Sequence, residues 1–182
     1  MANFIGFSPK DLNTVTNDVV AAKQLAQRCE NALIYRPGGA TLKMQKLLLD
    51  TFMIPLQDWE SEKNWDKAGK LRMRFGSFGK RIDIITCAYL QNYQNKPGEM
   101  PQIAFYDPGK HNVINITPHY FINTTQKYRS ATLIHEFIHM VQDKIGHSGN
   151  IQITFEGQIY LGIPFDLAYD NPYCYQYFAE WL

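Results

Sequence analysis

The sequence predicts an α+β domain with N-terminal helices, a small and mostly antiparallel sheet, a helix carrying a His-Glu-x-x-His motif, and a C-terminal helix. Three observations support this fold class. Apolar residues recur at helical spacing near the N-terminus, β-favouring residues form short runs between positions 81 and 116, and apolar residues surround the motif. With 182 residues, the chain is long enough for one core, so we expect a single domain spanning residues 1–182.

The N-terminal helices follow from capping and periodicity. Ser8 can cap a helix over residues 9–34, and Pro9 suits its first turn. Its core-facing stripe is expected to be Val15, Val19, Ala22, Ala26, Cys29 and Leu33. A second helix is expected over residues 41–53, with four inward side chains: Leu42, Leu48, Leu49 and Phe52. Residues 56–79 predict only a helix or loop, because three glycines interrupt any long element: Gly69, Gly76 and Gly79.

Three strands are expected over residues 81–89, 103–106 and 112–116, where β-favouring residues are frequent. Asp107-Pro108-Gly109-Lys110 has the composition of a turn, so the last two strands should form a hairpin. After the motif helix, residues 151–163 are compatible with a hairpin or a short helix. We expect a loop over residues 166–170 and a last helix over residues 173–182.

The His135-Glu136-x-x-His139 motif carries the clearest chemistry. Residues four apart lie on one face of a helix, so both imidazoles can point at one metal ion. Imidazoles suit zinc, which makes a water acidic, and Glu136 can then act as its general base. This spacing also arises by chance in a structural helix. The neighbours of the motif favour zinc, because they predict a buried helix and a buried His or Glu needs a partner. These apolar neighbours are Leu133, Ile134, Phe137, Ile138 and Val141.

The order of helices, sheet and motif helix resembles the zincin metallopeptidases, and its details resemble the deuterolysin-type (M35, aspzincin) family. Four stretches carry the likeness, and the alanine-rich first helix is one of them. The second is Ile84-Ile85-Thr86-Cys87 followed after a loop by Ile103-Ala104-Phe105-Tyr106, and the third is Val113 to Phe121 followed by Ala131 to Glu136. The fourth is Tyr177-Phe178-Ala179-Glu180 near the C-terminus. The resemblance implies that His135 and His139 bind zinc, that Glu136 is the catalytic base, and that the chain hydrolyses peptide bonds.

The third zinc ligand is where the chain departs from that family, which supplies an aspartate in Gly-Thr-x-Asp-x-x-Tyr-Gly shortly after the second histidine. A catalytic zinc needs a third protein ligand. His147 lies near the expected position, and Asp166 begins an Asp-x-x-Tyr match 27 residues after His139. These two are favoured, and Glu156 and Cys174 are alternatives.

A tyrosine that supports the oxyanion is also implied by the family. Tyr169 stands three residues after Asp166 and is the candidate that the match selects, so the two assignments depend on each other. Tyr160 is the alternative. Packing is the ordinary role of a tyrosine in a chain with 14% aromatic residues.

The expected function is that of a zinc-dependent metalloendopeptidase that acts on a protein or peptide. Two alternatives remain: a binding module that holds zinc without hydrolysis, and a delivered toxin or effector with one protein target. The formal net charge of +1 gives no reason to expect nucleic acid or a membrane surface as a partner. We expect a monomer.

The chain lacks the features of a Sec signal and of a membrane span, so a soluble protein is expected, with release by a non-Sec export route as an option. Its three cysteines, Cys29, Cys87 and Cys174, are too few and too far apart for a disulfide framework. Free thiols are the simpler expectation, with one bridge as the alternative.

Overall fold

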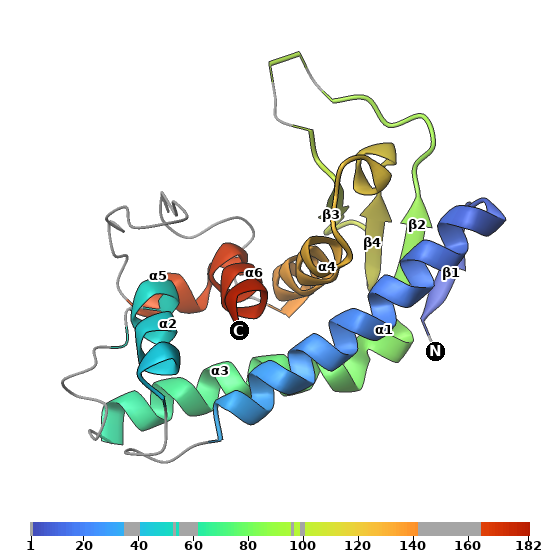
Figure 1. Ribbon diagram of the computed structural model, residues 1–182. Coiled ribbons are helices and arrows are strands. Elements are labelled where there is room, and N and C mark those ends of the chain that lie inside the picture. The colour runs from blue at the N-terminus through green and yellow to red at the C-terminus, as the bar shows by residue number, and fades with distance from the viewer. Residues whose placement is uncertain are drawn as a thin grey trace.

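The computed structural model describes residues 2–34, 41–52, 54, 62–95, 97–98, 101–141 and 165–182, and the side chains of residues 62 and 63 are not described. Within these ranges the chain forms six α-helices and a four-stranded sheet, which confirms the α+β class (Figure 1). The helices are α1 (Pro9–Ala32), α2 (Leu42–Phe52), α3 (Glu62–Arg81), α4 (Gln126–Val141), α5 (Phe165–Tyr169) and α6 (Pro172–Trp181). The strands are β1 (Asn3–Ile5), β2 (Thr86–Tyr89), β3 (Ala104–Tyr106) and β4 (Val113–Ile116), and the 3₁₀ turns are η1 (Ile82–Ile84) and η2 (Pro118–Phe121).

Helix α1 matches its prediction. The Ser8 side chain accepts a hydrogen bond from the Asp11 N–H at 3.2 Å, and Pro9 occupies the first turn. All six residues of the expected stripe are buried: Val15, Val19, Ala22, Ala26, Cys29 and Leu33.

Helix α2 was predicted correctly in its position and incorrectly at one inward residue. Leu42 is 80% exposed because it begins the helix, whereas Leu48 and Phe52 are fully buried. Leu49 is half-buried, and its neighbour Leu47 is buried instead.

The three glycines of residues 56–79 do not interrupt α3, which runs unbroken for 20 residues. The helix is stabilised by burial of Leu71, Phe75 and Phe78 against the rest of the core. At Gly76 the absence of a side chain lets α1 approach, because an added Cβ would lie 2.9 Å from the Glu30 Oε1.

The sheet has the order β1-β2-β4-β3, with β1 parallel to β2, β2 parallel to β4, and only β3 antiparallel to β4. The expectation of a mostly antiparallel sheet is therefore wrong. Strand β1 was not foreseen, and it reaches β2 through three helices, as parallel neighbours require. The strand predicted over residues 81–89 begins only at Thr86, after η1.

The hairpin of β3 and β4 was predicted correctly. Lys110 donates its N–H to the Asp107 carbonyl at 2.9 Å, and Gly109 donates to the Asp107 Oδ1 at 2.9 Å. β3 lies at the edge of the sheet and packs against α4 (Figure 1).

Helix α4 is the central element, packed against β3, α1 and α6 (Figure 1). A buried ion pair ties its first turns to α1: the Arg129 Nε lies 2.6 Å from the Asp18 Oδ2, and Asp18 is fully buried. Ser130 adds a hydrogen bond from its Oγ to the Asp18 carbonyl at 3.1 Å. These contacts fix the helix that carries the motif relative to the N-terminal helix.

At the C-terminus, Asn171 caps α6 by accepting from the Tyr173 N–H at 3.0 Å, in agreement with the predicted helix. Residues 166–170, expected to be a loop, lie largely within α5. In the described part of the chain, no helix combines the length and apolar character needed to cross a membrane.

Candidate active site

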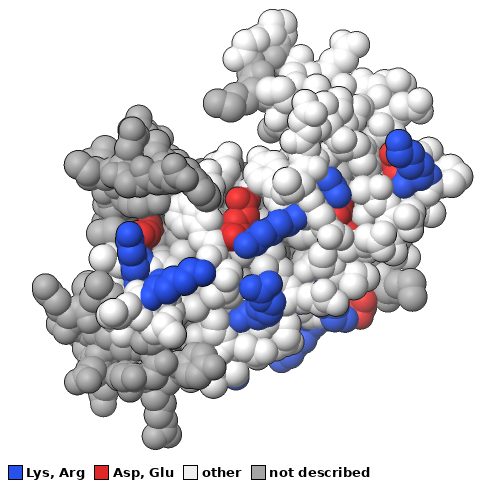
Figure 2. Space-filling model, in the orientation of Figure 1, with Lys and Arg blue, Asp and Glu red and all other residues white. Residues whose placement is uncertain are grey.

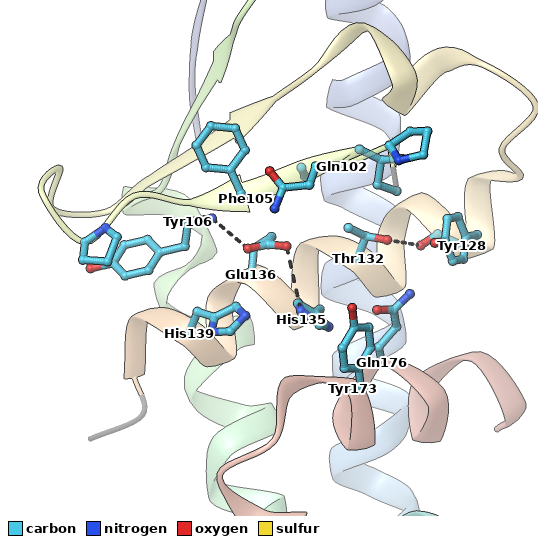
Figure 3. Close-up of a pocket in the computed structure, with 14 residues that line it drawn as sticks. Gln102, Phe105, Tyr106, Tyr128, Thr132, His135, Glu136, His139, Tyr173 and Gln176 are labelled. Atoms are coloured by element: carbon cyan, nitrogen blue, oxygen red, sulfur yellow. Dashed lines mark hydrogen bonds and ion pairs between the residues drawn. The ribbon is translucent and has the colours of Figure 1, made fainter. Parts of the chain in front are cut away.

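Helix α4 brings His135 and His139 together as their spacing predicts. Their ring centroids are 5.0 Å apart, and both rings face the same cavity as Glu136 (Figure 3). The cavity has a volume of about 400 Å³. It is bounded by α4, by β3 with its flanking residues, and by the first turns of α6. Its lining comprises Pro101, Gln102, Ile103, Ala104, Phe105, Tyr106, Pro108, Tyr128, Thr132, His135, Glu136, His139, Tyr173 and Gln176.

Glu136 is buried between strand and helix, with 6% of its surface exposed (Figure 3). Its Oε2 accepts a hydrogen bond from the Tyr106 backbone N–H at 2.7 Å, and its Oε1 lies 4.0 Å from the His135 Nε2. Burial raises the pKa of this carboxyl to about 8, and the Tyr106 bond opposes that rise. A carboxyl with such a pKa is suited to exchanging protons near neutral pH.

Tyr173 enters the same site from the first turn of α6 (Figure 3). Its ring centroid lies 4.5 Å from that of His135. Burial raises the pKa of its hydroxyl, and the nearby carboxylate of Glu136 raises it further. From the sequence, Tyr173 is expected only to begin the last helix, and no functional role is predicted for it. No spacing in the sequence connects it to His135, which lies on another helix.

The other end of the cavity is polar and uncharged. Tyr128 and Gln176 line it, and Gln176 donates from its Nε2 to the Glu180 Oε1 at 2.9 Å. Thr132 donates to the Tyr128 carbonyl at 3.0 Å (Figure 3). The cavity therefore joins a carboxylate and two imidazoles to a separate hydrogen-bonding region.

Asp166 and Tyr169 are not brought to this cavity. Both lie on α5, where Asp166 is exposed. The Tyr169 carbonyl accepts hydrogen bonds from Arg74 and from the Tyr175 hydroxyl, and the Arg74 guanidinium lies 3.7 Å from the centre of the Tyr169 ring. The structure thus gives Tyr169 a packing role with α3, whereas three other tyrosines line the cavity, and of these Tyr173 lies against the His135 ring.

Cys174, an alternative ligand, is fully buried and is not among the cavity residues, and burial raises its pKa. His147, Glu156 and Tyr160 lie outside the described residues. Among the described residues, no group of three or more His, Cys, Asp or Glu side chains is arranged to hold a metal ion.

Comparisons with known proteins give no match: no protein-family model fits the chain, and no curated protein resembles it significantly. The resemblance to the deuterolysin-type peptidases therefore stays a prediction from the residues quoted above.

Proposed function

We propose that the chain is a zinc-dependent endopeptidase whose site is built on α4. The observation that carries this proposal is the convergence of His135, Glu136 and His139 on one cavity beside an edge strand. A pair of imidazoles is the kind of donor set that zinc prefers. The Glu136 Oε1 lies 4.0 Å from the Nε2 of one of them, His135.

The described residues fit a zinc ion in part, because they provide two ligands and a catalytic site needs three. Asp166 lies on α5 outside the cavity, so we favour His147 as the third ligand, with Glu156 as the alternative. His147→Ala is expected to lower zinc affinity at least about tenfold in a competition titration with a chromogenic chelator. The Glu156→Ala variant provides the comparison, and the larger loss identifies the ligand.

A bound zinc ion would polarise the substrate carbonyl and increase the acidity of a water. Glu136 accepts a proton from a water in the cavity as the oxygen of this water attacks the carbonyl carbon. It then returns the proton to the amide nitrogen as the C–N bond breaks, which leaves one new carboxyl and one new amine. The Tyr173 hydroxyl donates a hydrogen bond to the oxyanion between these two steps.

Strand β3 offers the place for the peptide. Thr117 donates its N–H to the Ile103 carbonyl at 3.0 Å, and Phe105 is opposite Asn115. Successive residues of an antiparallel strand bond alternately to its two sides, so Ala104 and Tyr106 direct their N–H and C=O groups to the outer edge, which pairs with no other strand of the described chain. An extended peptide can add to this edge as a further strand above α4.

On the face in Figure 2, basic and acidic side chains are interspersed and most of the described surface is uncharged. This distribution suits recognition of a peptide through its backbone and side chains better than recognition of a polyanion.

The proposal is tested with Glu136→Gln, which keeps the shape of the side chain and removes its basicity. We expect about one zinc per chain in parent and variant, and turnover lowered about 10²–10⁴-fold on a mixed peptide library. Asp166→Asn, at an exposed position of α5, is the matched control and should retain parental turnover. Zinc binding with no cleavage by the parent would favour a metal-holding binding module, and equal turnover in parent and Glu136→Gln would refute the mechanism.

A further inference from the structure

The backbone N–H of Tyr106 has two competing uses. It directs its hydrogen toward the free edge of β3, where an added peptide strand would need a donor. That same N–H is already bonded to the Glu136 Oε2 at 2.7 Å. One N–H makes one good hydrogen bond, so Glu136 and a peptide carbonyl cannot both occupy it fully.

Ala104 differs from Tyr106 in this respect. It is the other residue of β3 that directs its N–H to the free edge. Alternate residues of a strand are about 6.6–6.8 Å apart, which is also the repeat of an extended peptide. Among the described residues, none accepts a hydrogen bond from the Ala104 N–H, whereas the Tyr106 N–H is bonded to Glu136, so a peptide that reaches both residues meets two different donors.

We propose, building on the proposed peptidase function, that the Tyr106 amide is a positioning group that holds Glu136 at the strand edge until the carbonyl of an extended peptide replaces it. Displacement frees the carboxylate to turn toward the side of α4 where His135 and His139 face the cavity. The site thereby couples occupation of the strand edge to release of its base.

This coupling defines a substrate class. A carboxylate is a stronger acceptor than a peptide carbonyl, so the exchange at Tyr106 is unfavourable by itself. Peptides that also bond Ala104 and fill the cavity supply the compensating contacts, whereas dipeptides do not reach both edge residues. We expect extended, unfolded segments of about six residues to be turned over and dipeptides to be poor substrates.

The direct test follows the amides of the full chain by ¹⁵N-resolved NMR, in metal-free and zinc-loaded protein. The probe is a hexapeptide whose scissile amide is replaced by a ketomethylene group, so it binds without being cleaved. We expect the Tyr106 amide proton to resonate downfield in the free protein, and to shift together with the Ala104 amide at the same peptide concentration. A shift of the Ala104 amide resonance with the Tyr106 resonance unchanged would overturn this inference and leave the proposed strand docking intact. No saturable shift at either amide would overturn the proposed strand docking as well.

A variant pair tests the functional consequence. Tyr106→Pro removes the outward N–H, a change tolerated on an edge strand, while Tyr106→Ala keeps the N–H and removes the side chain. Relative to Tyr106→Ala, which shares the loss of the ring, we expect Tyr106→Pro to show a severalfold higher kcat on a tripeptide and a severalfold higher KM on a cleavable hexapeptide that keeps its scissile amide. A lower kcat on both substrates in Tyr106→Pro alone would mean that the amide orients the base during turnover, and would overturn the inference. If Tyr106→Pro does not fold, the NMR titration of the parent decides.

Discussion

Asp18 and Glu136 are both carboxylates buried within the same packed helices, yet their surroundings differ. Asp18, on α1, is held by two guanidinium nitrogens of Arg129, at 2.6 and 3.1 Å. Glu136, on α4, contacts a backbone N–H and an imidazole, and its pKa rises to about 8. A buried carboxylate with a cationic partner serves as a fixed structural charge, whereas one held by weaker partners can change its protonation state.

The largest expected effect is on the free energy of unfolding, when the buried carboxylate of Asp18 is removed. Asp18→Asn leaves the Arg129 guanidinium without its counter-charge, so the free energy of unfolding should fall by about 3–5 kcal/mol. Urea denaturation followed by circular dichroism measures this change. Asp83→Asn is the control, because it removes an exposed ion pair with Lys23 and should cost less than about 1 kcal/mol. Equal losses in the two variants would contradict the distinction drawn here.

The next effect concerns the two tyrosines that stand four residues apart. Tyr173→Phe removes a hydroxyl from the cavity, so kcat on a cleavable hexapeptide should fall about 10²-fold with zinc binding retained. Tyr169→Phe keeps the ring that stacks on Arg74 and should leave kcat unchanged. A loss of kcat in Tyr169→Phe with none in Tyr173→Phe would support Tyr169 as the tyrosine that stabilises the oxyanion.

The smallest expected effect is the pH dependence of stability that Glu136 causes, and it tests how Glu136 differs from Asp18. In metal-free protein the pKa of Glu136 is raised from 4.5 to about 8, so between these values the folded state binds more protons than the unfolded state. The contribution of Glu136 to stability is present below about pH 4.5 and is lost as the pH rises through about 8. The stability of Glu136→Gln relative to the parent should therefore rise steadily from pH 5 to about pH 8.

Thermal unfolding of the metal-free proteins at matched ionic strength measures this gain. Asp166→Asn, which removes an exposed carboxylate on α5, is the control for the loss of one negative charge. A constant difference between Glu136→Gln and the parent across this range would show that the carboxyl is ionised throughout.

Features that depend on local periodicity could be predicted from the sequence. The apolar stripe of α1 and the shared face of His135 and His139 both follow from helical spacing, and both are present. The turn at residues 107–110 followed from its composition. The continuous helix α3 could not be foreseen, because its glycines lower local helix propensity while packing against α1 stabilises it.

Features that depend on contacts between distant segments could not be predicted. Tyr169 matched a motif by spacing, but Arg74, 95 residues earlier, determines its surroundings. Tyr173 reaches His135 only through the packing of α6 on α4. Tyr106 contacts Glu136 through its backbone N–H, so the amino-acid sequence could not predict this hydrogen bond.

The three cysteines of the chain are all buried as free thiols, at Cys29, Cys87 and Cys174. A thiol-reactive dye should therefore label the native protein slowly and report on opening of its core. Since these sulfurs are shielded, zinc that remains after dialysis of the folded protein would not be held by surface thiolates, and the proposed site at His135 and His139 would be the first candidate. Spectroscopic substitution with cobalt should accordingly give the bands of nitrogen and oxygen ligands, without the intense near-ultraviolet charge transfer that sulfur produces.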